Sequence, residues 1–157
     1  MEVLLIFIPI VLTTTAHMFV VKFDWFSFLK IPISRYLFGE NKTWRGFLFV
    51  IIVNALLMGA IGYAKLGAFL GLGYVLFELP NSFMKRRLGI EPGGKANKGK
   101  YFFMTIDRLD SAAGVVIFYH LMFPLSPMKI ILYILLGMLI HLSFSSTLYF
   151  LKVKKSL

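Results

Sequence analysis

The sequence predicts an all-α integral membrane protein with five transmembrane helices. Hydrophobic residues make up 59% of the 157 positions and charged residues only 15%, and the mean hydropathy is +0.81. A soluble domain of this length needs a polar surface, which so few charged residues cannot provide. The hydrophobic residues also gather into long runs separated by short or basic segments. We therefore expect residues 1–157 to form a single membrane-embedded domain.

The first hydrophobic run, at about residues 3–21, is expected to be a retained transmembrane helix. A signal peptide begins with a basic segment and ends at a small-residue cleavage site. Here the second residue is Glu2, and the apolar stretch is longer than the core of a signal peptide. This run is therefore assigned as the first span.

Four further spans are expected at about residues 46–63, 66–84, 109–124 and 129–151. About 20 apolar residues cross a bilayer, and fewer suffice where one end is polar and buried in protein. Only YAKLG and PLSPM separate the spans of the two pairs, which predicts two tight hairpins on one side of the membrane. Gly67 and Gly71 form a G-x-x-x-G pattern, which indicates a close contact between helices.

Positive charges concentrate in the two longer segments, about 22–45 and 85–108, and in the C-terminal tail. These regions hold five, seven and three of the 17 Lys and Arg residues. Cytoplasmic loops carry an excess of Lys and Arg, so we expect both polar loops and the C-terminus in the cytoplasm and the N-terminus outside. This bias explains the net charge of +10 without a nucleic-acid partner. The absence of cysteine excludes disulfides and thiolate metal sites.

A pair of carboxylates stands three positions apart in the motif DRLD. On a helix over residues 106–124, Asp107 and Asp110 share one face with Ser111 and Gly114. Two carboxylates this close repel one another unless a cation lies between them or one is protonated. The preceding span places Glu78 on one face with Ser82 and Lys85, next to Asn81.

Oxygen ligands without Cys or His are typical of Mg²⁺ sites. Asp107, Asp110 and Glu78 are therefore the predicted metal ligands. The alternative for Glu78 is an internal salt bridge to Lys85 or Arg86.

Two basic motifs could bind phosphate. Lys85, Arg86 and Arg87 offer several donors within one turn, although a topology anchor explains them equally well. In FGENKTWRGF (residues 38–47), Asn41 or Thr43 could cap the next helix, whose first amides favour an anion. Lys42 and Arg45 add positive charge there, and Trp44 is expected to be an interfacial anchor.

The segment GIEPGGKA (residues 89–96) has the glycine spacing of a P-loop. Ala96 stands where that loop needs Ser or Thr, and no parallel sheet precedes it, so we exclude a P-loop. We expect residues 89–100 to form a mobile loop that can close over a polyphosphate. The lone residues His17, His120 and His141 are expected to serve helix packing rather than metal binding.

A metal site, phosphate-binding cations and a membrane setting together favour phosphoryl or nucleotidyl transfer to a lipid. Two other classes stay open. A transporter would spread polar residues through its spans, whereas here they gather at one membrane face. A non-catalytic anchor would bind anionic lipid through its basic loops and would not need the carboxylate pair.

At these motifs the sequence resembles the CDP-archaeol synthase family, which is related to the phosphatidate cytidylyltransferases. The resemblance rests on GENKTWRGF, on SFMKRRLGI followed by a Pro–Gly loop, and on DRLDSAAG, and it covers nearly the whole chain. It implies a five-span enzyme of phospholipid biosynthesis. CTP would react with a lipid phosphate monoester, in the presence of Mg²⁺, to give CDP-lipid and pyrophosphate at the cytoplasmic face.

The resemblance also implies roles for individual residues. Asp107 and Asp110 match the metal-binding carboxylates, and Ser82, Lys85 and Arg86 match an element that handles the phosphates of CTP. We therefore predict Asp107, Asp110 and Lys85 as catalytic residues. The residues predicted to bind substrate are Asn41, Lys42, Thr43, Arg45, Asn81, Ser82, Arg86, Arg87 and Arg108.

The chain departs from the family pattern at two places. Phe77–Glu78 stands where Gly–Asp is expected. The expected pattern D-Q-L-D is DRLD here, so Arg108 takes the place of Gln. Glu78 keeps a carboxylate, so metal binding survives that change. The departures leave the lipid open between an archaeal-type isoprenoid glycerophosphate and a phosphatidate-like substrate. A homo-oligomer is also left open.

Overall fold

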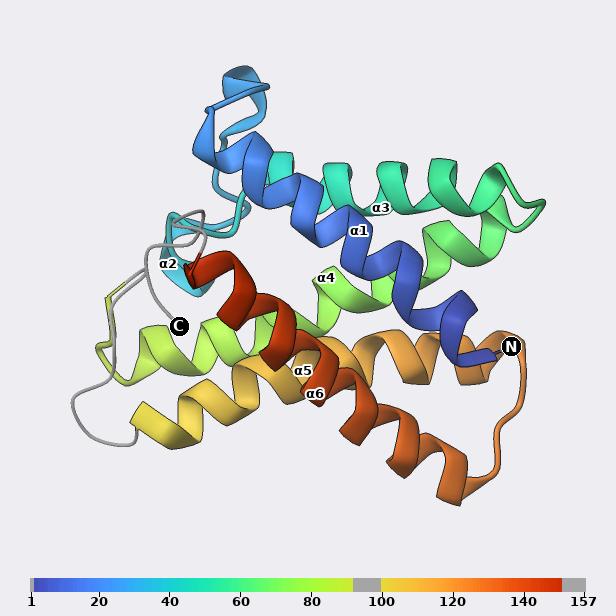
Figure 1. Cartoon of the computed structure of the whole chain (residues 1–157). Helices are drawn as coiled ribbons and strands as arrows, with labels where there is room; N and C mark the ends of the chain where they lie inside the picture. Colours follow the sequence, from blue (N-terminus) through green and yellow to red (C-terminus); the bar gives the residue numbers. More distant parts are fainter. Residues whose placement is uncertain (1, 92–99, 151–157) are drawn as a thin grey trace.

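The computed structural model describes residues 2–91 and 100–150 (Figure 1). This part of the chain contains six α-helices and one 3₁₀ helix, and it contains no β-strand. The predicted all-α class is therefore confirmed. The elements are α1 (Glu2–Lys22), η1 (Ser27–Leu29), α2 (Arg35–Phe38), α3 (Trp44–Gly59), α4 (Ala64–Arg87), α5 (Lys100–Met122) and α6 (Pro127–Phe150).

The long helix α4 occupies the centre of the bundle. It packs along both α3 and α5, while α1 covers α3 and α6 covers α5. Figure 1 shows the α3–α4 and α5–α6 turns at the same end of the bundle, as expected for two tight hairpins. The long connection from α1 to α3, with α2 inside it, lies at the opposite end together with the end of α4.

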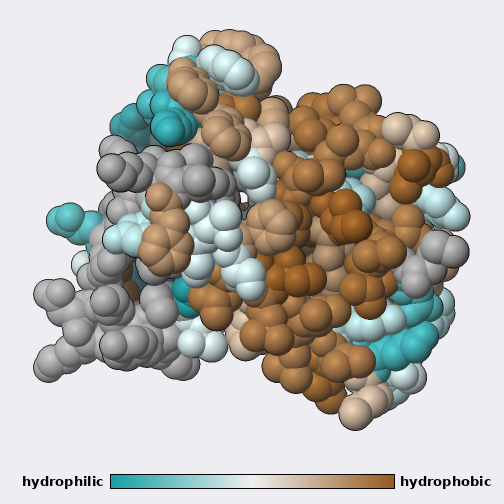
Figure 2. Space-filling view, viewed as in Figure 1, coloured by the Kyte–Doolittle hydropathy of each residue, from teal (hydrophilic) through white to brown (hydrophobic). Residues whose placement is uncertain are grey.

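Two helices in the described part of the chain are long and apolar enough to cross a membrane. They are α1 and the stretch Pro127–Thr147 of α6, and α3 is apolar but shorter. Figure 2 shows a broad hydrophobic surface on the face where α1 and α6 lie. The positions of five spans and the side on which each loop lies stay predictions.

The helix bounds differ from the predicted spans. Helix α5 begins at Lys100 rather than near residue 109, so Asp107 and Asp110 lie well inside the helix instead of at its start. Helix α3 ends at Gly59, before the predicted 63, because the turn that follows closes through Gly62 at φ 85°. The glycine-rich segment predicted to be a mobile loop lies mostly at 92–99, outside the described residues.

The predicted G-x-x-x-G contact is confirmed between α4 and α3. A Cβ atom on Gly67 would lie 2.5 Å from the carbonyl oxygen of Asn54, and one on Gly71 would lie 2.9 Å from Ile51 Cα. Because neither position has room for a side chain, the two helix backbones approach closely.

A polar junction links three helices inside the apolar bundle. The side chains of Thr13 in α1 and Asn54 in α3 are both fully buried. Asn54 Nδ2 donates to the carbonyl oxygen of Gly67 in α4 at 2.8 Å, and Thr13 Oγ1 donates to Asn54 Oδ1 at 3.2 Å. Each polar atom of the Asn54 side chain therefore has a partner, as a buried amide requires.

A second close contact sets α4 against α5. A Cβ atom on Gly73 would lie 2.6 Å from the carbonyl oxygen of Gly114, so the helices touch through their backbones here. On α5, Asp110 and Asp107 lie one and two turns before Gly114 on the same face. The glycine contact therefore brings that acidic face against the last turns of α4.

Candidate functional site

Polar side chains converge where the second half of α4 meets α5. We call this group the polar cluster. Helix α4 contributes one acid, one amide and one base, helix α5 contributes two acids and a hydroxyl, and the connection before α3 contributes a lysine. Its members are Lys42, Glu78, Asn81, Lys85, Asp107, Asp110 and Ser111.

Lys85 and Asp107 form an ion pair between α4 and α5. Lys85 Nζ lies 2.5 and 2.6 Å from the two carboxylate oxygens of Asp107. The ammonium also lies over the ring of Phe103, 5.8 Å from its centre. Lys85 therefore supplies one positive charge beside the carboxylate pair.

Asn81 bridges the two carboxylates of α5. Its Nδ2 lies 2.5 Å from Asp107 Oδ1 and 3.1 Å from Asp110 Oδ2, and the residue is only 4% exposed. The second oxygen of Asp110 accepts from the backbone N–H of Ser111 at 2.5 Å. Hydrogen-bond donors thus stabilise two acidic side chains that would otherwise repel one another.

Glu78 pairs with Lys42, which reaches the cluster from the segment before α3. The alternative salt bridge from Glu78 to Lys85 or Arg86 is therefore wrong, because Lys85 is turned toward α5. Burial alone would lower the pKa of the Lys42 ammonium, but the charge and hydrogen bond of Glu78 raise it above its ordinary value. Lys42 is therefore positively charged at neutral pH.

The oxygen atoms of the cluster fit the chemistry of Mg²⁺. Asp107 and Asp110 supply carboxylates, and Asn81 Oδ1 is buried and has no hydrogen-bond partner among the described residues. Such an all-oxygen set suits a hard cation that also keeps water and phosphate ligands. Within the described part of the chain, no three acidic or histidine side chains converge on one point. Glu78 as a third ligand therefore stays a prediction.

A cavity of about 130 Å³ adjoins the polar cluster on its α1 and α3 side. Lys42 and Glu78 form its polar wall together with Asn41 and Thr43, which come from the predicted basic motif. Thr43 Oγ1 accepts from the N–H of Gly46 at 3.4 Å, so Thr43 rather than Asn41 caps α3. The structure thus brings the motif before α3 to Glu78 of α4.

Two predicted substrate-binding residues make contacts away from the polar cluster, and their role in binding substrate stays a prediction. Arg45 is 4% exposed, and its Nη1 lies 2.7 Å from Asp24 Oδ1 and 3.1 Å from the carbonyl oxygen of Trp25. Arg87 stacks on the rings of Tyr36 and Phe83 and donates to the Tyr36 hydroxyl at 3.0 Å. Neither guanidinium contacts the polar cluster.

Three further predicted residues, Ser82, Arg86 and Arg108, lie on α4 and α5 beside members of the cluster in the sequence. Ser82 Oγ donates to the carbonyl oxygen of Glu78 at 2.9 Å, which is a bond within α4. Arg108 is buried in α5. Arg86 has two buried guanidinium nitrogens, Nε and Nη1, without a hydrogen-bond partner in the described part of the chain. Of the KRR motif, only Lys85 reaches the carboxylates.

Two residues of the site were not among the predicted ones. Ser111 Oγ lies 3.2 Å from both Glu78 Oε1 and Asp110 Oδ1, so it links the acids of α4 and α5. The buried Tyr74 hydroxyl interacts with Glu78 and Ser111. Helical spacing placed Ser111 on the face of Asp107 and Asp110 but gave it no role, and it could have found Tyr74, which lies one turn before Glu78.

A family model described as CDP-archaeol synthase (CarS-like) matches residues 28–157 of the chain. The chain belongs to the CDP-archaeol synthase family. Every member of the polar cluster lies within the matched segment, whereas the whole of α1 precedes it. The resemblance seen in the sequence motifs is thereby confirmed.

Several proteins named CDP-archaeol synthase are similar to this family member. The protein of Thermofilum pendens is 33% identical over 124 residues, which cover 75% of this chain and 57% of the relative. The protein of Methanopyrus kandleri is 32% identical over 105 residues, which cover 62% of this chain and 57% of the relative. That of Staphylothermus marinus is 30% identical over 129 residues, covering 75% and 69%. The matches thus span little more than half the length of the first two relatives. No solved structure matches the chain.

Proposed function

We propose that this chain is a membrane cytidylyltransferase that transfers CMP from CTP to a lipid phosphate monoester, giving CDP-lipid and pyrophosphate. One observation carries the proposal: the bridged pair Asp107–Asp110 and the adjacent Lys85 lie together at one end of an apolar helical bundle. Family membership supports the same activity, since the similar proteins are named CDP-archaeol synthase.

The reaction needs no side-chain nucleophile. An oxygen of the lipid phosphate attacks the α-phosphorus of CTP and forms a new P–O bond. The bond from that phosphorus to the bridging oxygen of the β-phosphate breaks, and pyrophosphate leaves with the bonding electrons. The chain therefore has to position two polyanions and stabilise the charge that develops between them.

The polar cluster provides the groups for this task. Asp107 and Asp110 would hold Mg²⁺, and the ion would neutralise phosphate oxygens and align the reacting groups. Asn81, whose Nδ2 faces both carboxylates, would keep the two acids in place. Lys85 would keep Asp107 oriented and donate to a phosphate of CTP from the side facing α4. Lys42, fixed by Glu78 beside the polar cavity, would hold a second phosphate, either of the nucleotide or of the lipid.

The setting that we propose is a membrane with the cluster at its cytoplasmic face. Two helices of membrane-spanning length support the membrane setting. The excess of Lys and Arg in segments 22–45 and 85–108 and in the C-terminal tail supports the cytoplasmic orientation. The lipid is either an isoprenoid glycerophosphate or a phosphatidate-like acyl lipid, and both present the same phosphate monoester to the cluster.

An assay of the purified protein tests the proposal. Radiolabelled CTP is supplied with Mg²⁺ and offered phosphatidate and an isoprenoid glycerophosphate in parallel. We expect labelled CDP-lipid from at least one of them, and no product when EDTA removes the metal. Absence of product from both lipids, with solute flux in proteoliposomes that needs no CTP, would favour a transporter instead.

A further inference from the structure

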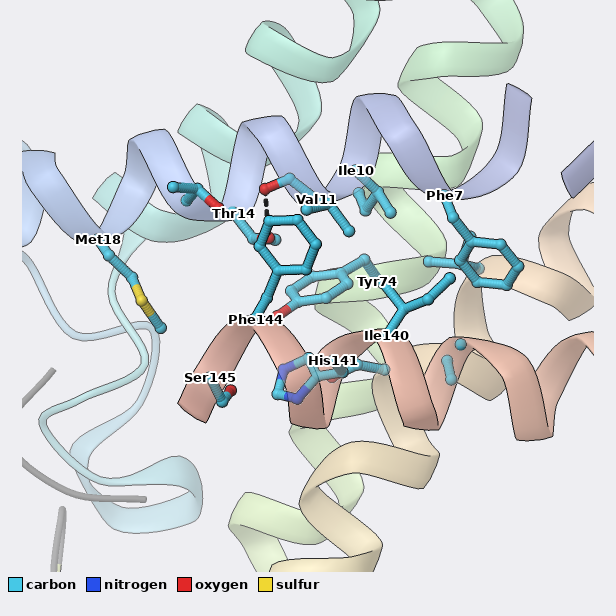
Figure 3. Close-up of a pocket in the computed structure, with 15 residues that line it drawn as sticks. Phe7, Ile10, Val11, Thr14, Met18, Tyr74, Ile140, His141, Phe144 and Ser145 are labelled. Atoms are coloured by element: carbon cyan, nitrogen blue, oxygen red, sulfur yellow. Dashed lines mark hydrogen bonds between the residues drawn. The ribbon is translucent and has the colours of Figure 1, made fainter. Parts of the chain in front are cut away.

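A second cavity, of about 60 Å³, lies between α1 and α6 (Figure 3). Its walls are mostly apolar and come from four helices, α1, α4, α5 and α6. The main contributors are Phe7, Ile10 and Val11 of α1, Val115 of α5, and Ile140 and Phe144 of α6. Since one water-sized group needs roughly 10–15 Å³ of such space, the cavity has room for about four to six methylene-sized groups.

Two of the helices that wall this cavity, α1 and α6, are the ones of membrane-spanning length in the described part of the chain. Their outward sides expose large apolar residues such as Leu12 and Leu139. Figure 2 shows hydrophobic surface over this face of the molecule. In a bilayer, lipid chains would therefore surround both helices, and the cavity lies directly between them.

The inner end of the cavity reaches the polar cluster. Ser111, which lies 3.2 Å from both Glu78 and Asp110, lines the cavity. Tyr74 extends from α4 into the space between α1 and α6, as Figure 3 shows, and it lines this cavity as well as the polar one. Tyr74 and Ser111 thus line the apolar cavity and also contact the acids of the polar cluster.

We propose that this cavity binds the part of the lipid's apolar chain nearest to the phosphate, which places the phosphate at the polar cluster. The inference rests on the proposed function, because it assigns a subsite to the lipid substrate of that reaction. An amphiphile with an anionic head and an apolar chain is complementary to the arrangement. The head would meet Lys42 and Lys85, and the chain would run outward between α1 and α6 into the bilayer.

The first experiment is photolabelling of the purified full chain without CTP. The probe is phosphatidate with a diazirine on the first methylenes of one acyl chain. We expect adducts on the cavity-facing residues of α1 and α6, suppressed by excess unlabelled phosphatidate and not by phosphatidylcholine. Adducts confined to outward residues such as Leu12 and Leu139, or equal competition by both lipids, would overturn the proposal.

Matched substitutions give the second readout. Val11→Phe and Ile140→Phe fill the cavity, whereas Leu12→Phe and Leu139→Phe add the same ring on the neighbouring lipid-facing positions. We expect the filling variants to lose specific labelling by at least about fivefold, since overpacked sites reject their occupant. We expect the two control variants to label as the wild type does. Equal labelling of all four variants would contradict the inference.

The outcomes separate the subsite from the activity. Labelling needs no turnover, so the cavity can be tested even if the transfer assay yields no product. CDP-lipid formation combined with labelling outside the cavity would keep the proposed function and remove this subsite. A filling variant that does not fold is recognised by its elution from a size-exclusion column. In that case the positions of the adducts on the wild-type chain decide whether the cavity binds the lipid chain.

Discussion

The ammonium of Lys85 lies 2.5 and 2.6 Å from the two carboxylate oxygens of Asp107, so one ion pair joins α4 to α5 inside the candidate site. The same carboxylate accepts from Asn81, which also donates to Asp110. A change in any one of these side chains therefore alters the charge and the position of the others. The predictions below use this coupling.

Lys85 and Asp107 are expected to act as one unit in catalysis. Lys85→Met and Asp107→Asn should each lower Mg²⁺-dependent pyrophosphate release by at least about 100-fold, and the double variant should lose little more than either single one. A double-mutant cycle on kcat/KM measures this coupling. Lys65→Met, at the opposite end of α4, is the control and should keep activity. Additive losses would show that the two residues act independently.

Asp110 is expected to be required as a carboxylate. Asp110→Asn keeps the size of the side chain but removes a charge and a metal ligand, so release of pyrophosphate from CTP and lipid phosphate should fall by at least about 100-fold. The matched control is Glu40→Gln, which alters an exposed acid paired loosely with Arg35 at 3.9 Å. Wild-type turnover in Asp110→Asn would remove it from the site.

A third acid at position 81 is expected to make stability depend on Mg²⁺. Asn81→Asp replaces the bridging amide by a carboxylate between two others, so the Tm without divalent ions should fall by roughly 5 °C or more. Addition of Mg²⁺ should recover most of this loss, because a cation would take the place of the lost donors. Thermal melts in detergent with and without Mg²⁺ measure both effects. Equal Mg²⁺ shifts in wild type and variant would argue against a cation at this position.

The backbone contact between α4 and α5 is expected to control the site. A Cβ atom on Gly114 would press on α4 at Gly73, so Gly114→Ala should cost roughly 1–3 kcal/mol of stability and lower activity as the carboxylates separate from Asn81. Gly59→Ala is the control, since its added methyl would make an ordinary contact 3.4 Å from Ala64 Cβ. Denaturant unfolding and the transfer assay are measured on both. Retained activity in Gly114→Ala would show that the helix spacing is not critical.

The ion pair of Asp24 with Arg45 is expected to give a pH-dependent contribution to stability. The hydrogen bonds from Arg45 and Lys30 lower the pKa of Asp24. A carboxyl group whose pKa is lower in the folded than in the unfolded state stabilises the fold at any pH above its unfolded-state pKa. This stabilisation is lost as the pH falls through the folded-state pKa. The Tm of Asp24→Asn should therefore lie below that of wild type at pH 7, with the gap closing toward pH 3. A gap that stays constant with pH would point to packing rather than charge.

Much of the site could be predicted from helical periodicity. The spacing of Asp107, Asp110 and Ser111 on one face, and of Glu78 with Lys85 on another, follows from 3.6 residues per turn and holds in the structure. Glycine at 67 and 71 correctly indicated a close helix contact. Family motifs then joined these faces into one site.

The pairing between helices could not be read from the sequence. Glu78 has possible partners about two turns away on its own helix, Lys85 and Arg86, yet it pairs with Lys42, which is 36 positions distant. Arg45 looked like a phosphate ligand because of its motif, and only the fold of residues 23–26 shows that it binds Asp24 and Trp25. The start of α5 was missed because hydropathy marks apolar residues, whereas a helix continues through polar ones.

The buried amide of Asn54 bears on how the chain assembles in a bilayer. As a predicted span, α3 alone among lipids would leave this amide without a partner, and an unpaired amide in hydrocarbon is costly. Gly67 follows on the very next helix, so the hairpin of α3 and α4 can supply the first hydrogen bond as soon as it is inserted. Thr13 was synthesised earlier and must wait for that hairpin. We therefore expect α1 to dock onto a preformed α3–α4 pair, so that the two walls of the apolar cavity are brought together only late in folding.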